Sequence, residues 1–108
     1  MPALLTVILA STQIALAADS VPELNIEPTC HDAAMAMPVQ DRHEDVCKRD
    51  ENEARGKLQQ EWAQFTAGQR AHCVTLTSLG GPPSYVELLT CLEMAKAAAD
   101  QPVTGQKP

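Results

Sequence analysis

Aromatic side chains are scarce in this sequence: only Trp62, Phe65 and Tyr85 are aromatic among 108 residues. Hydrophobic residues nevertheless make up 44% of the chain, so any core has to be built from aliphatic side chains and alanine. Single domains commonly take about 100–200 residues. The length therefore predicts one small domain with an aliphatic core.

Basic residues are also in short supply, with 8 Lys and Arg against 14 Asp and Glu, which gives a formal net charge of −6. Nucleic acids and anionic membrane surfaces are bound through an excess of positive charge. The composition therefore argues against both classes of partner. A cationic protein remains a suitable partner for this chain.

The common catalytic motifs are missing. No serine among Ser11, Ser20, Ser78 and Ser84 lies in a Gly-x-Ser-x-Gly elbow, and the absence of Cys-x-x-Cys removes the usual arrangement for redox catalysis. Acidic residues between 41 and 61 alternate with basic ones, which is typical of a solvated helix face. These acids are Asp41, Glu44, Asp45, Asp50, Glu51, Glu53 and Glu61. We therefore expect a protein that is not an enzyme.

Charged residues are absent from residues 1–18, and every Lys, Arg, Asp and Glu lies from Asp19 onward. The apolar stretch is shorter than the roughly 20 residues of a membrane span, and Ala15-Leu16-Ala17 matches the small-x-small cleavage pattern. We expect residues 1–18 to be a signal peptide. The prediction is a periplasmic or secreted protein without a stable membrane anchor after cleavage.

The four cysteines, Cys30, Cys47, Cys73 and Cys91, all follow this segment. An even number in an exported chain indicates disulfides, although four cysteines allow three pairings. If the helices flanking residues 80–83 run antiparallel, Cys73 and Cys91 differ by only about 1.5 Å along the helix axis. We therefore predict Cys73–Cys91, which leaves Cys30–Cys47.

Helical periodicity dominates residues 41–101. Larger apolar residues fall mostly three or four apart at Val46, Ala54, Leu58, Trp62, Phe65 and Leu76, which predicts one helical face with Trp62 and Phe65 in the core. Gly68 indicates a kink or break near residues 66–68. After the turn at Gly80-Gly81-Pro82-Pro83, Ser84 and Glu87 form a capping-box pattern that starts a second helix ending by residues 100–102. Its apolar face comprises Tyr85, Leu88, Leu89, Leu92 and Ala95.

The predicted fold class is all-α, a small helical hairpin or bundle stapled by two disulfides. Residues 19–40, which contain several prolines, are expected to form an extended N-terminal strap, within which Thr29 could cap a short helix up to Met37. Residues 41–101 form the helical domain and residues 102–108 a disordered tail. Tyr85, Pro82 and Pro83 are the candidate partner-contact residues.

A metal site is the alternative reading, since three histidines accompany the four cysteines and His43 and Cys47 stand at i and i+4. Structural zinc sites usually bring ligands two to four residues apart, and the cysteine spacings here are far longer. A periplasmic metal-binding protein using His31, His43, His72 and the cysteines is therefore the second candidate. The first candidate is an exported, disulfide-stabilised binding protein without catalytic activity, in which no metal or other cofactor is expected.

Two resemblances add to these predictions. The order Gln60-x-Trp62-x-x-Phe65, Arg70-x-x-Cys73, Gly80-Gly81 and Cys91 loosely resembles the LprI-type lysozyme-inhibitor family of small exported bacterial proteins. This resemblance implies a disulfide-stapled helical bundle in the periplasm that binds a lysozyme, which is a cationic protein. Residues 81–94 also look like small exported four-cysteine proteins of rhizobial type, to which no activity is attached.

Overall fold

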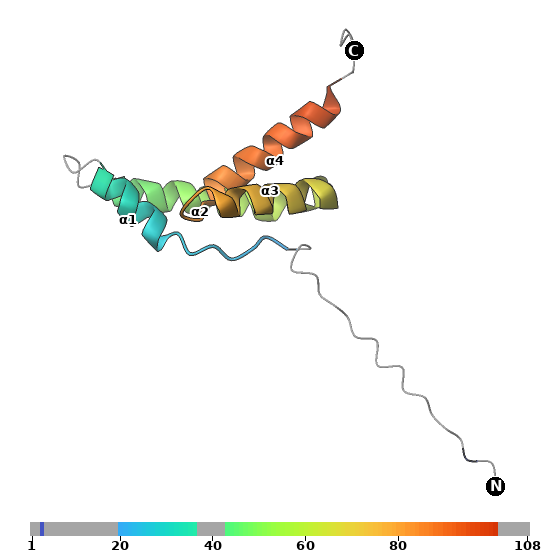
Figure 1. Ribbon diagram of the computed structural model, residues 1–108, viewed down its shortest axis with the longest axis horizontal. Coiled ribbons are helices and arrows are strands. Elements are labelled where there is room, and N and C mark those ends of the chain that lie inside the picture. The colour runs from blue at the N-terminus through green and yellow to red at the C-terminus, as the bar shows by residue number, and fades with distance from the viewer. Residues whose placement is uncertain (1–2, 4–19, 37–42, 102–108) are drawn as a thin grey trace.

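The computed structural model describes residues 3, 20–36 and 43–101. These residues form α1 (Glu27–Ala36), α2 (His43–Glu61), the short 3-10 helix η2 (Trp62–Gln64), α3 (Ala67–Leu79) and α4 (Tyr85–Asp100), with no strand in the described ranges (Figure 1). The predicted all-α fold is confirmed. The predicted signal peptide, except Ala3, and the predicted tail lie outside the described residues.

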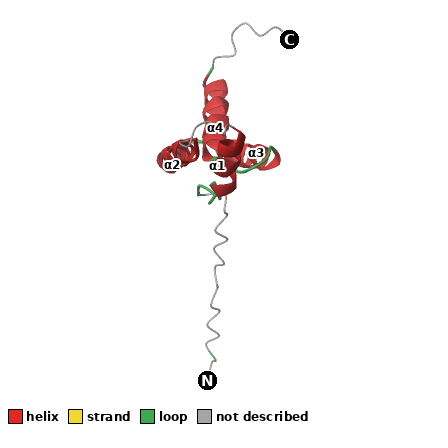
Figure 2. Ribbon diagram, turned by 90° about the vertical axis from the view of Figure 1, so that its left-hand side faces the viewer, coloured by secondary structure: helices red, strands yellow, loops and turns green. Residues whose placement is uncertain are grey.

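Helices α2 and α4 form the centre of the molecule. Helix α1 packs on α2 and α3 packs on α4, and in Figure 2 α2 and α3 lie on either side of α4. The core consists mainly of apolar residues of α2, η2 and α4, together with Phe65, which follows η2, and Cys73 of α3. Its buried members are Ala54, Leu58, Trp62, Phe65, Cys73, Tyr85, Leu88, Leu89 and Leu92.

The apolar face predicted for residues 41–76 is confirmed in its middle and wrong at both ends. Ala54, Leu58, Trp62 and Phe65 are buried, whereas Val46 is 38% and Leu76 is 49% exposed. Leu76 belongs to α3, which starts after the break, so its position no longer follows the periodicity of α2. Val46 lies in the first turn of α2, ahead of the buried residues of that helix, which begin at Glu51.

The break between α2 and α3 has a clear local cause. Thr66 caps α3: its Oγ1 accepts a hydrogen bond from the Gln69 amide at 3.1 Å, and Gln69 Oε1 accepts one from the Thr66 amide at 2.9 Å. This reciprocal capping box satisfies amides that a continuous helix would have satisfied itself. The predicted break near residues 66–68 is therefore confirmed.

The turn and the start of α4 also follow the sequence. Gly81 has a φ of 121°, a conformation that glycine adopts without steric cost. Ser84 is the N-cap of α4, and its hydroxyl accepts a hydrogen bond from the Glu87 amide at 3.2 Å. The return bond from the Ser84 amide to the Glu87 side chain is not formed, so only half of the predicted capping box is present. The predicted second helix is confirmed through Asp100.

The predicted strap is extended at residues 20–26. The short helix predicted within it is present as α1 but starts at Glu27, ahead of Thr29, and residues 37–40 of the predicted strap lie outside the described residues. Helix α1 starts at Glu27, whose amide donates to Asn25 Oδ1 at 3.2 Å, and Pro28 is tolerated because it lies in the first turn. Thr29 is consequently inside the helix and is not its cap. Its hydroxyl donates instead to the Pro83 carbonyl at 2.5 Å, which ties α1 to the turn before α4.

Candidate functional site

Both predicted disulfides are present, Cys30–Cys47 with a Cα–Cα distance of 5.4 Å and Cys73–Cys91 with 5.7 Å. The first joins α1 to α2 and the second joins α3 to α4. Cys30 is the only buried residue of α1, and Cys73 is the only buried residue of α3. Each disulfide therefore attaches a helix that contributes little else to the core.

The three histidines lie on three different helices. His31 in α1 and His72 in α3 are exposed, and His43 at the start of α2 is half-buried. Within residues 20–36 and 43–101, no group of three or more His, Cys, Asp or Glu side chains is placed to hold a metal ion. All four cysteines are engaged in disulfides.

The candidate contact residues near the turn have different surroundings. Pro82 is exposed and Pro83 half-buried, whereas Tyr85 is only 2% exposed. The Tyr85 hydroxyl accepts a hydrogen bond from the Leu24 amide at 2.8 Å, so it holds the extended strap. The Arg55 guanidinium lies 5.7 Å from the centroid of the Tyr85 ring. A partner contact at these residues stays a prediction, and Tyr85 already serves an intramolecular role.

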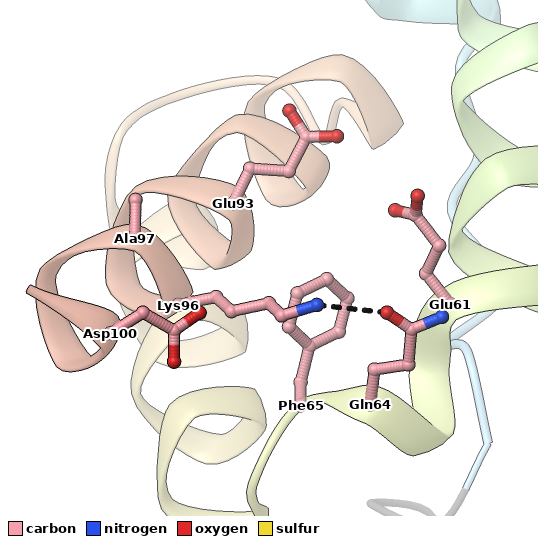
Figure 3. A pocket seen from close by; sticks show the side chains of 7 residues that line it. All are labelled: Glu61, Gln64, Phe65, Glu93, Lys96, Ala97 and Asp100. Atoms are coloured by element: carbon pink, nitrogen blue, oxygen red, sulfur yellow. Dashed lines mark hydrogen bonds between the residues drawn. The ribbon is translucent and has the colours of Figure 1, made fainter.

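A groove opens where the C-terminal end of α2 and η2 face the second half of α4. Its volume is about 220 Å³, and Phe65, which is 3% exposed, closes its inner side. Figure 3 shows Glu61 and Glu93 on opposite walls with their carboxylates turned toward the space between them. The lining residues are Glu61, Gln64, Phe65, Glu93, Lys96, Ala97 and Asp100.

The charges in this groove do not balance. Lys96 is the only cation in its lining, and its Nζ donates to Gln64 Oε1 at 2.9 Å, across the gap between α4 and η2 (Figure 3). Glu61, Glu93 and Asp100 supply three carboxylates. The ion pairs found among the described residues, which join Lys48 to Glu27 and Glu44, Arg49 to Asp50 and Arg55 to Glu23, leave these three out. The groove thus presents net negative charge to solvent.

One acidic residue of α2 does not fit the predicted solvated face. Glu51 is only 4% exposed, and its carboxylate accepts hydrogen bonds from the Ser84 hydroxyl and the Tyr85 amide, both at 2.5 Å. The expectation that all these acids face solvent is therefore wrong for Glu51. A sequence signal existed, since Glu51 precedes Ala54 by three residues and Leu58 by seven, on the buried face of the helix.

No protein-family model, curated protein or solved structure matches this chain. Among the described helices, none is both long enough and apolar enough to cross a membrane.

Proposed function

We propose that this protein is an exported, disulfide-stabilised binding protein that acts without catalysis and binds a cationic protein, with a lysozyme as the specific candidate. The observation that supports this best is the groove between α2 and α4. There Glu61, Glu93 and Asp100 form no ion pair with the described residues, while the one lining cation binds an amide oxygen.

The groove suits a protruding basic side chain. Its volume of about 220 Å³ is below the roughly 300–1,000 Å³ of small-molecule pockets. The methyl group of Ala97 and the buried ring of Phe65 offer apolar surface to an aliphatic stem, and the carboxylates meet the charged head, as long basic side chains prefer. Complementary charge of this kind raises the rate of association and selects the partner.

Export is the second part of the proposal. Two disulfides in a small domain are consistent with an extracellular or periplasmic location, because oxidising compartments are where such bonds persist. The charge-free apolar segment at residues 1–18 adds to this, as does the resemblance to exported lysozyme inhibitors. A lysozyme would meet the protein in the same compartment.

The test is a binding titration with hen egg-white lysozyme, with cytochrome c as a second cationic protein. The groove variant carries Glu61→Gln, Glu93→Gln and Asp100→Asn. Its matched control removes the same charge at exposed sites elsewhere, with Asp32→Asn, Asp45→Asn and Glu53→Gln.

We expect lysozyme binding to weaken as salt is raised through the screening range. The groove variant should bind at least about tenfold more weakly than the control, which corresponds to about 1.4 kcal/mol. Three outcomes would contradict specific binding of lysozyme in the groove. They are equal weakening of binding in the two variants, lysozyme binding that does not depend on salt, and an affinity for cytochrome c equal to that for lysozyme. An absence of lysozyme binding would remove lysozyme as the partner.

A further inference from the structure

Helix α3 is attached to the rest of the molecule mainly by its disulfide. Of its 13 residues only Cys73 is buried, and Val74 is half-buried against the core. The apolar residues after Val74 face solvent, with Leu76 49% and Leu79 79% exposed. A helix that buries so little apolar surface gains little docking energy without a cross-link.

The polar contacts of α3 with the described parts of its neighbours lie at its N-terminal end. Gln69 Nε2 donates to the Ala95 carbonyl at 3.4 Å, and the Arg70 guanidinium lies 5.7 Å from the Trp62 ring centroid. Thr77 and Ser78, further along, donate only to carbonyls of α3 itself. The C-terminal half of α3 is therefore held by the Cys73–Cys91 bond and by the packing of Val74.

Helix α1 differs, although it also buries only its cysteine. Thr29 donates to the Pro83 carbonyl, Glu27 pairs with Lys48 at 3.2 Å, and the preceding strap donates from Leu24 to the Tyr85 hydroxyl. These contacts would keep α1 in place if the Cys30–Cys47 bond opened. The two disulfides thus have different mechanical roles.

We propose that Cys73–Cys91 is a redox-sensitive disulfide that holds α3 on α4. Its reduction by a dithiol releases α3 from α4, while α1, α2 and α4 stay folded together. Release would uncover the side of α4 around Cys91 and Ala95. That side adjoins the apolar groove of about 460 Å³ lined by Leu76, Val86, Glu87, Thr90, Cys91 and Met94. The molecule would then expose a larger apolar surface in the reduced form than in the oxidised form.

The exchange starts at Cys91, since Cys91 is only partly buried whereas Cys73 is fully buried. A thiolate of the dithiol attacks Cys91 Sγ, the bond to Cys73 breaks, and Cys73 leaves as a thiolate that takes up a proton. The second thiol of the reductant then attacks the sulfur of its own molecule in the mixed disulfide and releases Cys91 as a thiol. The protein disulfide is reduced to two thiols and the dithiol is oxidised to a disulfide.

Amide hydrogen exchange followed by mass spectrometry tests the release, with Cys73→Ser and Cys91→Ser together as the opened form. Cys30→Ser and Cys47→Ser together form the matched control. We expect exchange in residues 67–79 to accelerate roughly 100-fold in the first variant. This is the size expected when a disulfide that closes a loop across 18 positions of sequence is removed. Protection in residues 50–60 and 86–95 should persist, and the control should leave residues 67–79 protected.

Two outcomes of this experiment would overturn the proposal. Unchanged protection of residues 67–79 would mean that α3 docks without the bond, and loss of protection in all helices would mean that the bond supports the whole domain. A second measurement uses the natural chain, titrated with dithiothreitol and trapped with an alkylating reagent. Cys73 and Cys91 should be alkylated before Cys30 and Cys47. The reverse order would also overturn the proposal that Cys73–Cys91 is the redox-sensitive disulfide.

Discussion

The side chain of Glu51 in α2 caps the first turn of α4 through the amide of Tyr85. Its Oε2 accepts a hydrogen bond from this amide at 2.5 Å, and its Oε1 accepts one from the Ser84 hydroxyl at the same distance. A carboxylate is favourable at a helix N-terminus because unpaired amides and the helix dipole place positive charge there. The two central helices are therefore joined by a buried polar contact as well as by leucine packing.

Replacing Glu51 by Gln should destabilise the fold by about 2 kcal/mol. The change removes the negative charge, and it places the side-chain NH₂ of the glutamine against the Ser84 hydroxyl or the Tyr85 amide, which donate to the carboxylate in the natural chain. Urea denaturation followed by circular dichroism measures this. Glu53→Gln is the control, since Glu53 is exposed on the same helix and should change stability by no more than about 0.5 kcal/mol. Equal stability of the two variants would refute the capping role of Glu51.

Removing the Tyr85 hydroxyl should loosen the strap and leave the helices intact. Tyr85→Phe keeps the buried ring and deletes the acceptor of the Leu24 amide, at an expected loss of about 0.5–1.5 kcal/mol. Hydrogen exchange at Leu24 should accelerate while exchange at Leu88 should not. Thr90→Val, which deletes a hydroxyl that donates only within α4, is the control. Unaltered exchange at Leu24 would show that the strap is held by other contacts.

Core leucines should be far more sensitive than exposed ones. Leu92 is fully buried and Leu79 is 79% exposed. Leu92→Ala should lower the free energy of unfolding by about 2–5 kcal/mol because it leaves a cavity, whereas Leu79→Ala should change it by no more than about 0.5 kcal/mol. Thermal unfolding of the oxidised protein compares the two. Similar losses for both would mean that Leu79 is covered in solution.

Alkaline pH should weaken the contact between α1 and α2. The hydrogen bond to Glu27 and its charge, with Glu44 adding to both, raise the pKa of Lys48 above its ordinary 10.5. The pKa of Lys48 is higher in the folded than in the unfolded chain. The stability that protonated Lys48 contributes through its carboxylate partners is therefore fully present below the unfolded pKa and is lost as pH rises through the folded pKa. Lys48→Met should therefore lose less stability than the natural chain as the pH rises above the ordinary lysine value of 10.5. Lys57→Met, a control on the same helix, should follow the natural chain, and an identical profile for all three would contradict the prediction.

Much of the fold could be predicted from the sequence because its signals are local. The turn at residues 80–83, the Ser84 cap and the spacing of Cys73 and Cys91 fix an antiparallel α3–α4 pair. The start of α1 differs from the predicted one because Asn25, rather than Thr29, accepts the hydrogen bond from the amide of Glu27, the first residue of the helix.

The tertiary polar contacts could not be predicted in the same way. Glu51 reaches Tyr85 across 34 positions of sequence and Leu24 reaches it across 61. No local pattern encodes such pairs. The acidic groove has the same origin, because Glu61 comes from α2 whereas Glu93 and Asp100 come from α4, and only the packing of the two helices brings them together.

The central proposal, a cationic protein bound in the α2–α4 groove, is tested most directly by mapping the contact. Unlabelled hen egg-white lysozyme is titrated into the ¹⁵N-labelled oxidised protein, and backbone amide shifts are followed residue by residue. The largest shifts are expected at residues 61–65 and 93–100, fading as salt is added. Shifts centred on α1, on the apolar groove beside Leu76, or spread evenly over all acidic residues would contradict the groove as the binding site.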